Sequence, residues 1–206
     1  MENGTLSDPR IVFFDSIAEV WDGWHDLALL TKKLDAEFER FGLLGSETIL
    51  DVGCGTGNLT RALLERLGPD GRVIALDISP AMVGRARQKV GDPRVMWELA
   101  SADRIPVADA SFDRILCFSV WPHFDDQVAV IREFHRVLRP GGSVHILHLI
   151  SREEVNRIHG QAHPSVHADL LAPVRDVASL FERGGFAVIE TADDTCRYLL
   201  TARRGA

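Results

Sequence analysis

Cysteine is scarce in this chain of 206 residues. Its three cysteines, Cys54, Cys117 and Cys196, are too few and too scattered for a disulfide framework. No apolar run is long enough to cross a bilayer. The first ten residues, MENGTLSDPR, lack the charged and apolar regions of a signal peptide. We therefore expect no membrane span, no export, and the cytoplasm as the default location.

Positive charge is also in short supply. Lysine and arginine together number 23 against 30 acidic residues, which gives a net charge of −7. A general nucleic-acid binder usually carries a basic face, so we expect no nucleic-acid partner. Repeats, low-complexity tracts and linkers are absent as well, and a chain of this length fits one domain. The sequence therefore predicts a single domain over residues 1–206.

One stretch, TILDVGCGTGNL at Thr48 to Leu59, combines a short apolar run with three glycines at alternate positions. The pattern predicts a buried strand that turns through Gly53, Gly55 and Gly57 into a helix. Such a turn brings bare backbone and a helix N-terminus close to a ligand. It lacks the G-K-[ST] of a phosphate-binding P-loop, and its third glycine comes one residue too early for the dinucleotide fingerprint.

Strand and helix patterns alternate along the rest of the chain, which is typical of a doubly wound parallel sheet. Two final strand-like runs read as a hairpin, so one terminal strand should be antiparallel. Two helices are expected between Arg10 and Phe41, and Pro140-Gly141-Gly142 should end the helix that Asp125 caps. The expected strands are 49–52, 72–77, 94–99, 112–118, 143–149, 186–190 and 197–201, and the expected later helices are 59–66, 80–90 and 125–138.

Three aspartates follow successive strands and indicate the chemistry of the ligand. Asp51 stands beside the glycine turn, where a carboxylate would repel a pyrophosphate and attract an ammonium group. Asp77 ends the next strand, where an acid accepts hydrogen bonds from ribose hydroxyls. Asp103 follows the third strand and could accept from an adenine amino group. A cationic amino acid, a ribose and an adenine together describe S-adenosylmethionine.

Four segments occur in an order and spacing that resemble the motifs of class I S-adenosylmethionine-dependent methyltransferases. They are ILDVGCGTGNLT, VIALDIS, ASADRIPVADASFDRILCFSVWPHF and EFHRVLRPGG. The resemblance is strongest to the small-molecule branch that includes the ubiquinone/menaquinone C-methyltransferases. It implies an α/β, Rossmann-like, seven-stranded sheet in the order 3-2-1-4-5-7-6 with strand 7 antiparallel, and S-adenosylmethionine as cofactor.

The resemblance also implies roles for individual residues. Residues of the glycine turn should line the methionine portion, those after the second and third strands should hold ribose and adenine, and Ser119 should lie beside the sulfonium. Cys54 is read as a small turn residue rather than a nucleophile. The residues so assigned to cofactor binding are Asp51, Gly53, Cys54, Gly55, Gly57, Asp77, Ile78, Met82, Ala102, Asp103 and Ser119.

Methyl transfer from a sulfonium needs a general base only when the nucleophile carries a tightly held proton. His123, just after the fourth strand, and His148, at the end of the fifth, are the candidates for this role. His123 could instead be a structural residue of its loop. Trp121 beside it is a candidate wall of the substrate pocket.

The stretch from Ser151 to Ala172 is expected to face the substrate and begins with a capping box. Its His159 and His163 are candidate substrate contacts, and Pro164 should place His163 at a helix end. These histidines, together with His148 or an acid such as Asp169, could bind a metal ion or an anionic substrate, but we favour no metal. The aromatic segment before Phe41 either packs on the domain or forms a lid, with Phe14 and Trp21 facing the substrate.

The sequence thus predicts four parts within the domain. Residues 1–44 form an N-terminal helical cap, 45–150 a cofactor-binding core, 151–172 a substrate-facing insertion, and 173–206 the last helix and hairpin. The expected function is methyl transfer to a small molecule. The alternatives are a non-catalytic binder of S-adenosylmethionine or S-adenosylhomocysteine with a regulatory role, and an enzyme that uses the cofactor for other chemistry. The oligomeric state is open, a homodimer included.

Overall fold

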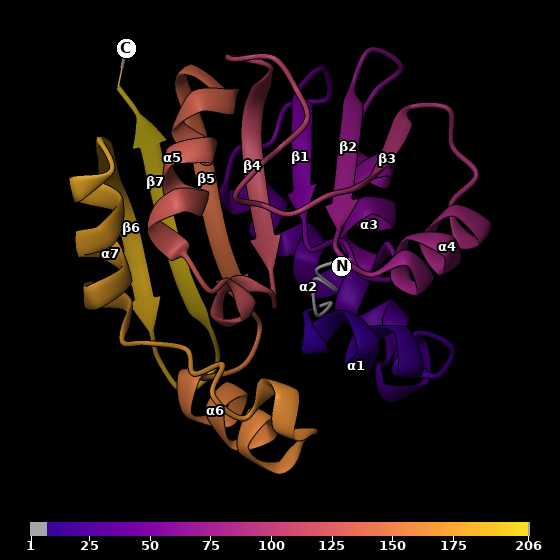
Figure 1. Ribbon diagram of the computed structural model, residues 1–206. Coiled ribbons are helices and arrows are strands. Elements are labelled where there is room, and N and C mark those ends of the chain that lie inside the picture. Colours follow the sequence, from indigo (N-terminus) through magenta and orange to yellow (C-terminus); the bar gives the residue numbers. More distant parts are fainter. Residues whose placement is uncertain (1–7, 206) are drawn as a thin grey trace, which may run out of the picture.

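The computed structural model describes residues 8–205, which form a seven-stranded sheet flanked by helices (Figure 1). The strand order is β3-β2-β1-β4-β5-β7-β6, and β7 runs antiparallel to both of its neighbours. The predicted fold class is therefore confirmed. The strands are β1 Thr48–Val52, β2 Arg72–Asp77, β3 Val95–Leu99, β4 Phe112–Phe118, β5 Leu138–His148, β6 Phe186–Asp193 and β7 Tyr198–Arg204.

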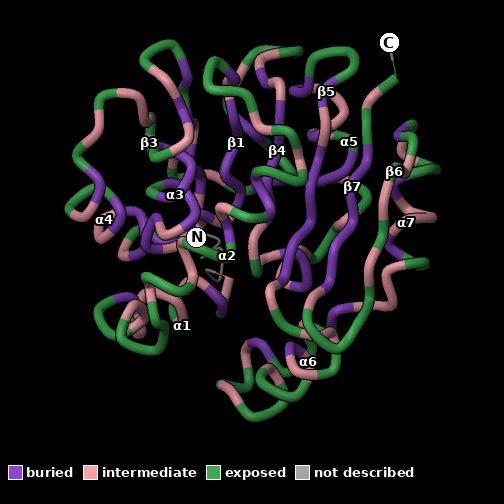
Figure 2. The backbone as a smooth tube through the Cα atoms, turned by 180° about the vertical axis from the view of Figure 1, so that it is seen from behind, coloured by how far each residue is buried: buried purple, intermediate pink, exposed green. Residues whose placement is uncertain are grey.

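Both faces of the sheet are buried under helices, which explains the nearly continuous apolar runs in its central strands. Successive side chains point to opposite faces, so Ile49 packs with helices α2 (Leu27–Arg40) and α3 (Asn58–Arg66). Leu50 packs on the other face with α5 (Gln127–Val137) and α7 (Val174–Arg183). Figure 2 shows the resulting band of buried backbone along the central strands.

Several short elements gather at the carboxyl ends of the parallel strands, where doubly wound sheets bind their ligands. Figure 1 shows α1 (Pro9–Ile17) and α6 (Arg152–Gln161) at this end. The three short 3-10 helices are η1 (Trp21–Trp24), η2 (Trp121–His123) and η3 (Pro164–Val166). Helix α4 (Pro80–Lys89) begins beside them, capped by Ser79 as expected. No helix within residues 8–205 has the length and apolar character needed to cross a membrane.

The expected junction between the fifth helix and the fifth strand was wrong in two details. Asp126, not Asp125, caps α5, because its carboxylate accepts from the amide of Ala129 at 2.9 Å. The helix ends at Val137, and β5 already begins at Leu138 and runs through the Pro-Gly-Gly sequence. Leu138 pairs with Phe112 on β4, and the register then shifts. Regular pairing with β4 resumes at Ser143, so the Pro-Gly-Gly sequence forms an irregularity within β5 rather than a turn before it.

The two expected N-terminal helices are present, but Trp21 lies in η1 between them rather than in the first helix. Asp26 begins the second helix by accepting from the amide of Leu29 at 3.0 Å. The loose tail expected over residues 1–9 lies almost entirely outside the described residues. The terminal hairpin is confirmed, with strands that extend further than the sequence pattern indicated.

Candidate functional site

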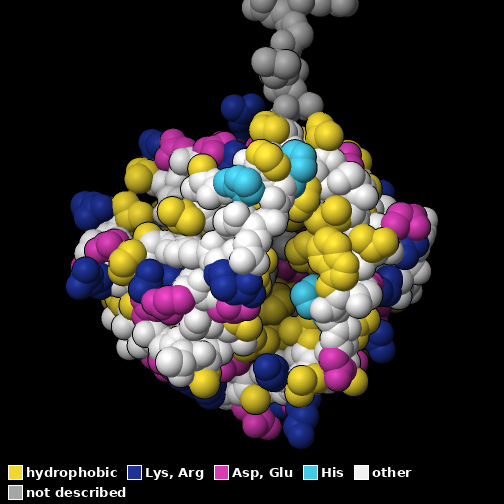
Figure 3. All heavy atoms as spheres, turned by 90° about the horizontal axis from the view of Figure 1, so that it is seen from below, with side chains coloured by type: hydrophobic (Ala, Val, Ile, Leu, Met, Phe, Trp, Pro, Cys, Tyr) yellow, Lys and Arg dark blue, Asp and Glu magenta, His cyan; other side chains and the backbone are white. Residues whose placement is uncertain are grey.

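A cavity opens at the carboxyl ends of β1, β2 and β4 (Figure 3). Figure 3 shows this face hollowed, with hydrophobic side chains in the hollow and a histidine at its edge. Every residue expected to bind the cofactor lines it except Gly57. Those residues are Asp51, Gly53, Cys54, Gly55, Asp77, Ile78, Met82, Ala102, Asp103 and Ser119.

The glycine turn needs its glycines for two different reasons. Gly53 has a φ of +67°, and a Cβ there would lie 2.3 Å from a methyl carbon of Val120. Gly55 also has a positive φ, but its Cβ would meet open space. Gly57, with a φ of +82°, faces Ala86 and Trp97 at 3.2 and 3.1 Å instead of the cavity. The absence of a side chain at Gly57 therefore lets α3 and α4 pack closely, and its expected place beside the methionine portion stays a prediction.

Two buried carboxylates define the electrostatics of the turn. Burial, with a smaller contribution from nearby Asp77, raises the pKa of Asp51 to about 7, although Thr60 donates to it at 2.5 Å. Burial also raises the pKa of Asp77, partly offset by the amides of Ser79 and Gly55, which donate at 2.9 and 2.8 Å. An ammonium group bound beside Asp51 would favour its ionised form.

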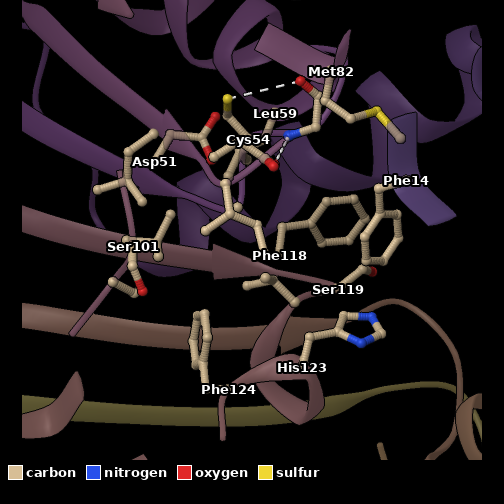
Figure 4. Close-up of a pocket in the computed structure, with 18 of the residues that line it drawn as sticks. Phe14, Asp51, Cys54, Leu59, Met82, Ser101, Phe118, Ser119, His123 and Phe124 are labelled. Atoms are coloured by element: carbon tan, nitrogen blue, oxygen red, sulfur yellow. Dashed lines mark hydrogen bonds between the residues drawn. The ribbon is translucent and has the colours of Figure 1, made fainter. Parts of the chain in front are cut away.

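The opposite side of the cavity is aromatic. Phe14 and Trp21 reach it from the N-terminal segment, as expected, and Phe118 and Phe124 reach it from the ends of β4 and η2. Figure 4 shows His123 among these rings, with Asp51 and Cys54 across the cavity. The Phe14 and His123 rings meet edge to face, with centroids 5.2 Å apart. The cofactor residues and an apolar surface for an acceptor thus share one space.

His123 is held in place by Asp169, a residue of the 151–172 insertion. The His123 Nδ1 atom lies 2.7 Å from Asp169 Oδ2, and both side chains are nearly buried, at 13% and 12% exposure. The other Asp169 oxygen lies 3.6 Å from Nη1 of Arg10 on α1. Arg10 also donates to the backbone oxygen of His123 and pairs with Asp8 and Asp125. The imidazole is therefore fixed from both its side chain and its backbone.

The second candidate base, His148, lies outside the cavity lining. It is 2% exposed and packs edge to face on Tyr198. Burial, together with His123 and His159 nearby, lowers its pKa to about 3, and its Nε2 atom has no hydrogen-bond partner among the described residues. The structure thus gives His148 a place in the core rather than beside the reacting atoms.

The expected pocket wall at Trp121 was wrong. Trp121 is fully buried and packs on Phe124 and Phe181, on the α5–α7 side of the sheet. Because it begins the 3-10 turn that His123 ends, the two side chains point to different places. Trp121 therefore supports the turn that carries His123.

The two remaining histidines also lie outside the cavity lining. His159 contacts the His123 ring, with centroids 4.8 Å apart, and its Nδ1 bonds the backbone oxygen of Asp169. His163 follows the end of α6, as expected, and stacks on Phe13 at the surface. Within residues 8–205 no cluster of histidine, cysteine and acidic side chains could hold a metal.

The N-terminal segment is tied directly to the cofactor side of the cavity. Asp22 on η1 accepts from Thr56 Oγ1 at 2.6 Å and from Asn58 Nδ2 at 3.0 Å, both in the glycine turn and the start of α3. Lys89 at the end of α4 pairs with Asp22 at 2.7 Å. Burial acts to raise the pKa of Asp22, but the bonds from Lys89, Thr56 and Asn58 outweigh it and hold that pKa below its usual value. Asp15 similarly accepts from Ser79.

Acidic side chains dominate the charged groups of the cavity lining. Among residues 8–205 the lining includes no lysine or arginine. Apart from its aspartates, its titratable side chains are Cys54, His25 and His123. Asp51, Asp77 and Asp103 belong to the cofactor side. The lining aspartates are Asp8, Asp51, Asp77, Asp103, Asp125 and Asp126. The site is therefore suited to cationic and neutral ligands rather than anionic ones.

Sequence reasoning missed three residues that act through long-range contacts. Arg10, Asp22 and Lys89 carry no local motif that marks them, and Asp169 was considered only as a partner of histidines in a metal or anion site. Phe118 and Phe124 could have been found from the sequence. Phe118 is the last residue of β4 and Phe124 follows η2, so both lie near the carboxyl end of a parallel strand, where ligands bind in such sheets.

Comparison with known proteins agrees with this geometry. A family described as "Methyltransferase domain" matches residues 49–142. The ubiquinone/menaquinone biosynthesis C-methyltransferase UbiE of Hahella chejuensis is 31% identical over 143 residues, which cover 65% of this chain and 57% of that protein. The malonyl-[acyl-carrier protein] O-methyltransferase of the same organism is 40% identical over 96 residues, covering 47% and 34%. The chain thus spans between about a third and three fifths of the length of these curated relatives.

Solved structures share the fold. The methyltransferase in a complex with the Trm112 methyltransferase activator of Haloferax volcanii superimposes with a TM-score of 0.79, at 23% identity over 94% of this chain and 96% of that one. A SAM-dependent methyltransferase of Aquifex aeolicus gives a TM-score of 0.69 at 21% identity, over 97% and 99%. Fold, motif order and the acid-rich glycine turn agree, and the chain belongs to the class I S-adenosylmethionine-dependent methyltransferases.

Proposed function

We propose that this protein transfers the methyl group of S-adenosylmethionine to a small-molecule acceptor by in-line displacement. The observation that carries the proposal is the shared cavity, which has the cofactor residues on one side and four aromatic side chains on the other. In such a space a bound acceptor lies directly against the sulfonium. Because the sulfonium is an activated leaving group, holding the two reactants in line supplies much of the catalysis.

The proposed roles on the cofactor side follow the strand ends. Asp51 binds the ammonium group, Asp77 the ribose hydroxyls and Asp103 the adenine amino group, while Ile78 and Met82 pack on the adenine. These assignments are supported by the position of each side chain in the lining and by the charge of Asp51 and Asp77.

We also propose that residues 9–24 act as a lid. Their contacts span the opening: Asp22 bonds the glycine turn, and Arg10 bonds the backbone of His123. Replacing Asp22 by Asn removes the ion pair with Lys89 and should speed S-adenosylhomocysteine release at least fivefold in stopped-flow fluorescence. Lys32→Met removes one charge from the exposed face of α2 and serves as the control. This variant should release S-adenosylhomocysteine at the wild-type rate. Equal release rates in both variants would contradict the lid.

The test of the function itself uses cofactor with a labelled methyl group. Labelled cofactor is incubated with a metabolite extract and with three purified acceptor classes, namely hydroquinones, thiols and amines. We expect label in a low-molecular-weight product and stoichiometric S-adenosylhomocysteine. Tight binding of S-adenosylhomocysteine by calorimetry, without transfer to any pool, would instead support the non-catalytic binder.

A further inference from the structure

The strongest unassigned feature is the pair formed by His123 and Asp169. It brings together two side chains 46 positions apart, from η2 and from the loop after η3. Both are nearly buried, and one of them lines the cavity where the acceptor would lie. A histidine whose Nδ1–H is held by a carboxylate keeps Nε2 unprotonated, and such a nitrogen can accept a proton.

We propose that His123 is the general base of the methyl transfer, that Asp169 is its positioning residue, and that the acceptor is an uncharged molecule whose nucleophilic atom carries a proton. This inference rests on the proposed function and specifies the chemistry of that same site.

The orientation of the pair follows from its contacts. Asp169 Oδ2 accepts from Nδ1 of His123, which leaves Nε2 as the ring nitrogen directed at the cavity. Arg10 holds the other Asp169 oxygen and the backbone oxygen of His123. Among residues 8–205, His123 Nε2 has no hydrogen-bond partner. The geometry is therefore that of a base prepared for a proton from a bound molecule.

Three groups surround the His123 ring. The Asp169 carboxylate contacts it, and the neighbouring cation, Arg10, is already paired with Asp8 and Asp125 as well as Asp169. The ring of His159 is also adjacent, and burial lowers the pKa of His159. A proton taken up at Nε2 would therefore lie on a ring that a nearly buried carboxylate already binds.

The step balances in atoms and charge. The acceptor X–H gives its proton to Nε2 of His123, and the lone pair of X attacks the methyl carbon. The X–CH3 bond forms as the S–CH3 bond breaks, and the bonding pair stays on sulfur, which becomes the thioether of S-adenosylhomocysteine. The positive charge of the sulfonium thereby moves to the imidazole, and no oxidant or reductant is needed.

The lining explains why the acceptor carries no negative charge. Three aspartates beyond those of the cofactor side line the cavity: Asp126, and Asp8 and Asp125, which both pair with Arg10. Because no lysine or arginine of the described residues lines the cavity, an anionic acceptor would have no cationic partner in the lining. Phe14, Phe118 and Phe124 instead offer ring faces to an apolar body.

Spectroscopy and kinetics test the pair separately. In the S-adenosylhomocysteine complex, ¹⁵N shifts of His123 should show Nδ1 protonated and Nε2 unprotonated, and Asp169→Asn should disturb this tautomer. With hydroquinone as acceptor, Asp169→Asn and His123→Ala should lower kcat about 100-fold or more with KM within threefold, as expected for loss of a general base. Imidazole added to His123→Ala should restore part of the rate. Asp176→Asn, an exposed aspartate on α7, is the matched control and should keep the wild-type rate.

The choice of acceptor separates chemistry from folding. Thiophenol ionises readily and needs little help from a base, so Asp169→Asn should slow its methylation less than threefold. 4-Hydroxybenzoate has a carboxylate in place of one of the two hydroxyls of hydroquinone. Its kcat/KM should therefore be at least tenfold lower than that of hydroquinone.

Four results would overturn the inference. Three are an Nε2-protonated tautomer, equal losses with thiophenol and hydroquinone, and preference for the carboxylate probe. The fourth is a wild-type protein that methylates neither neutral probe, which would contradict the acceptor class. If that protein still labels a product from the extract, the proposed function stands and only this inference fails.

Discussion

Binding of the cofactor should be coupled to release of a proton from Asp51. In the free protein, burial and the proximity of Asp77 raise the Asp51 pKa to about 7, so about half of the molecules carry a protonated carboxyl at neutral pH. In the proposed site, the ammonium group of S-adenosylhomocysteine binds the ionised carboxylate. Binding of S-adenosylhomocysteine must therefore shift Asp51 from the protonated to the ionised form and release the proton.

The size of the change in affinity with pH follows from the fraction of Asp51 that is ionised. With a pKa of about 7, that fraction is about a thirtieth at pH 5.5 and about half at pH 7.0. The affinity for S-adenosylhomocysteine should accordingly rise about fifteenfold over this range. An α-amino group remains largely protonated up to pH 7, so the ligand adds little pH dependence of its own.

Isothermal titration calorimetry measures both effects. Titrations at pH 5.5 and 7.0 give the affinity, and titrations at pH 6.0 in buffers of different ionisation enthalpy give the protons released, which should be about 0.9 per ligand. Asp51→Asn should bind more weakly and lose the pH dependence, whereas Asp103→Asn, an exposed lining aspartate, should retain it. Equal affinity at the two pH values, without proton release, would refute the argument.

Two further predictions concern the turn and the core. Gly53→Ala should abolish measurable cofactor binding and lower the melting temperature clearly more than Gly55→Ala, because its Cβ would clash with Val120 while that of Gly55 meets open space. Similar losses in the two variants, measured by calorimetry and thermal unfolding, would contradict this reading. His148 has a folded-state pKa of about 3, so wild-type stability should fall as the pH drops below about 6.5. His148→Leu should remove about 2 kcal/mol of the loss between pH 7.5 and pH 5, measured by urea unfolding, and an unchanged loss would count against the buried neutral ring.

The cofactor side of the site was predictable because it follows from strand ends. Parallel strands bring their carboxyl ends to one edge, so Asp51, Asp77 and Asp103 had to meet there once the strands were recognised. The order of the strands came from the family resemblance rather than from periodicity, and the structure confirms it.

The acceptor side was less predictable, because its contacts join distant segments. No local pattern connects Asp169 with His123, or Arg10 with a residue 113 positions away. The error at Trp121 has a related cause: composition does not distinguish an aromatic residue beside a site from one beneath it. For His148 the alternation of β5 was informative, since it shares a face with Ile146, which packs in the α5–α7 core.

The positive charges of the cofactor and of His123 connect the two sides of the cavity during the proposed reaction. S-adenosylmethionine enters with an ammonium and a sulfonium, and the acidic lining suits both. In the proposed mechanism, transfer from the sulfonium to an X–H acceptor leaves the same charge in the cavity, because His123 would become an imidazolium beside Asp169. The acidic side chains would therefore still face two positive charges at the moment of reaction. The charge in the cavity would decrease only when the proton leaves His123, and the imidazole must lose that proton before it can act as a base again.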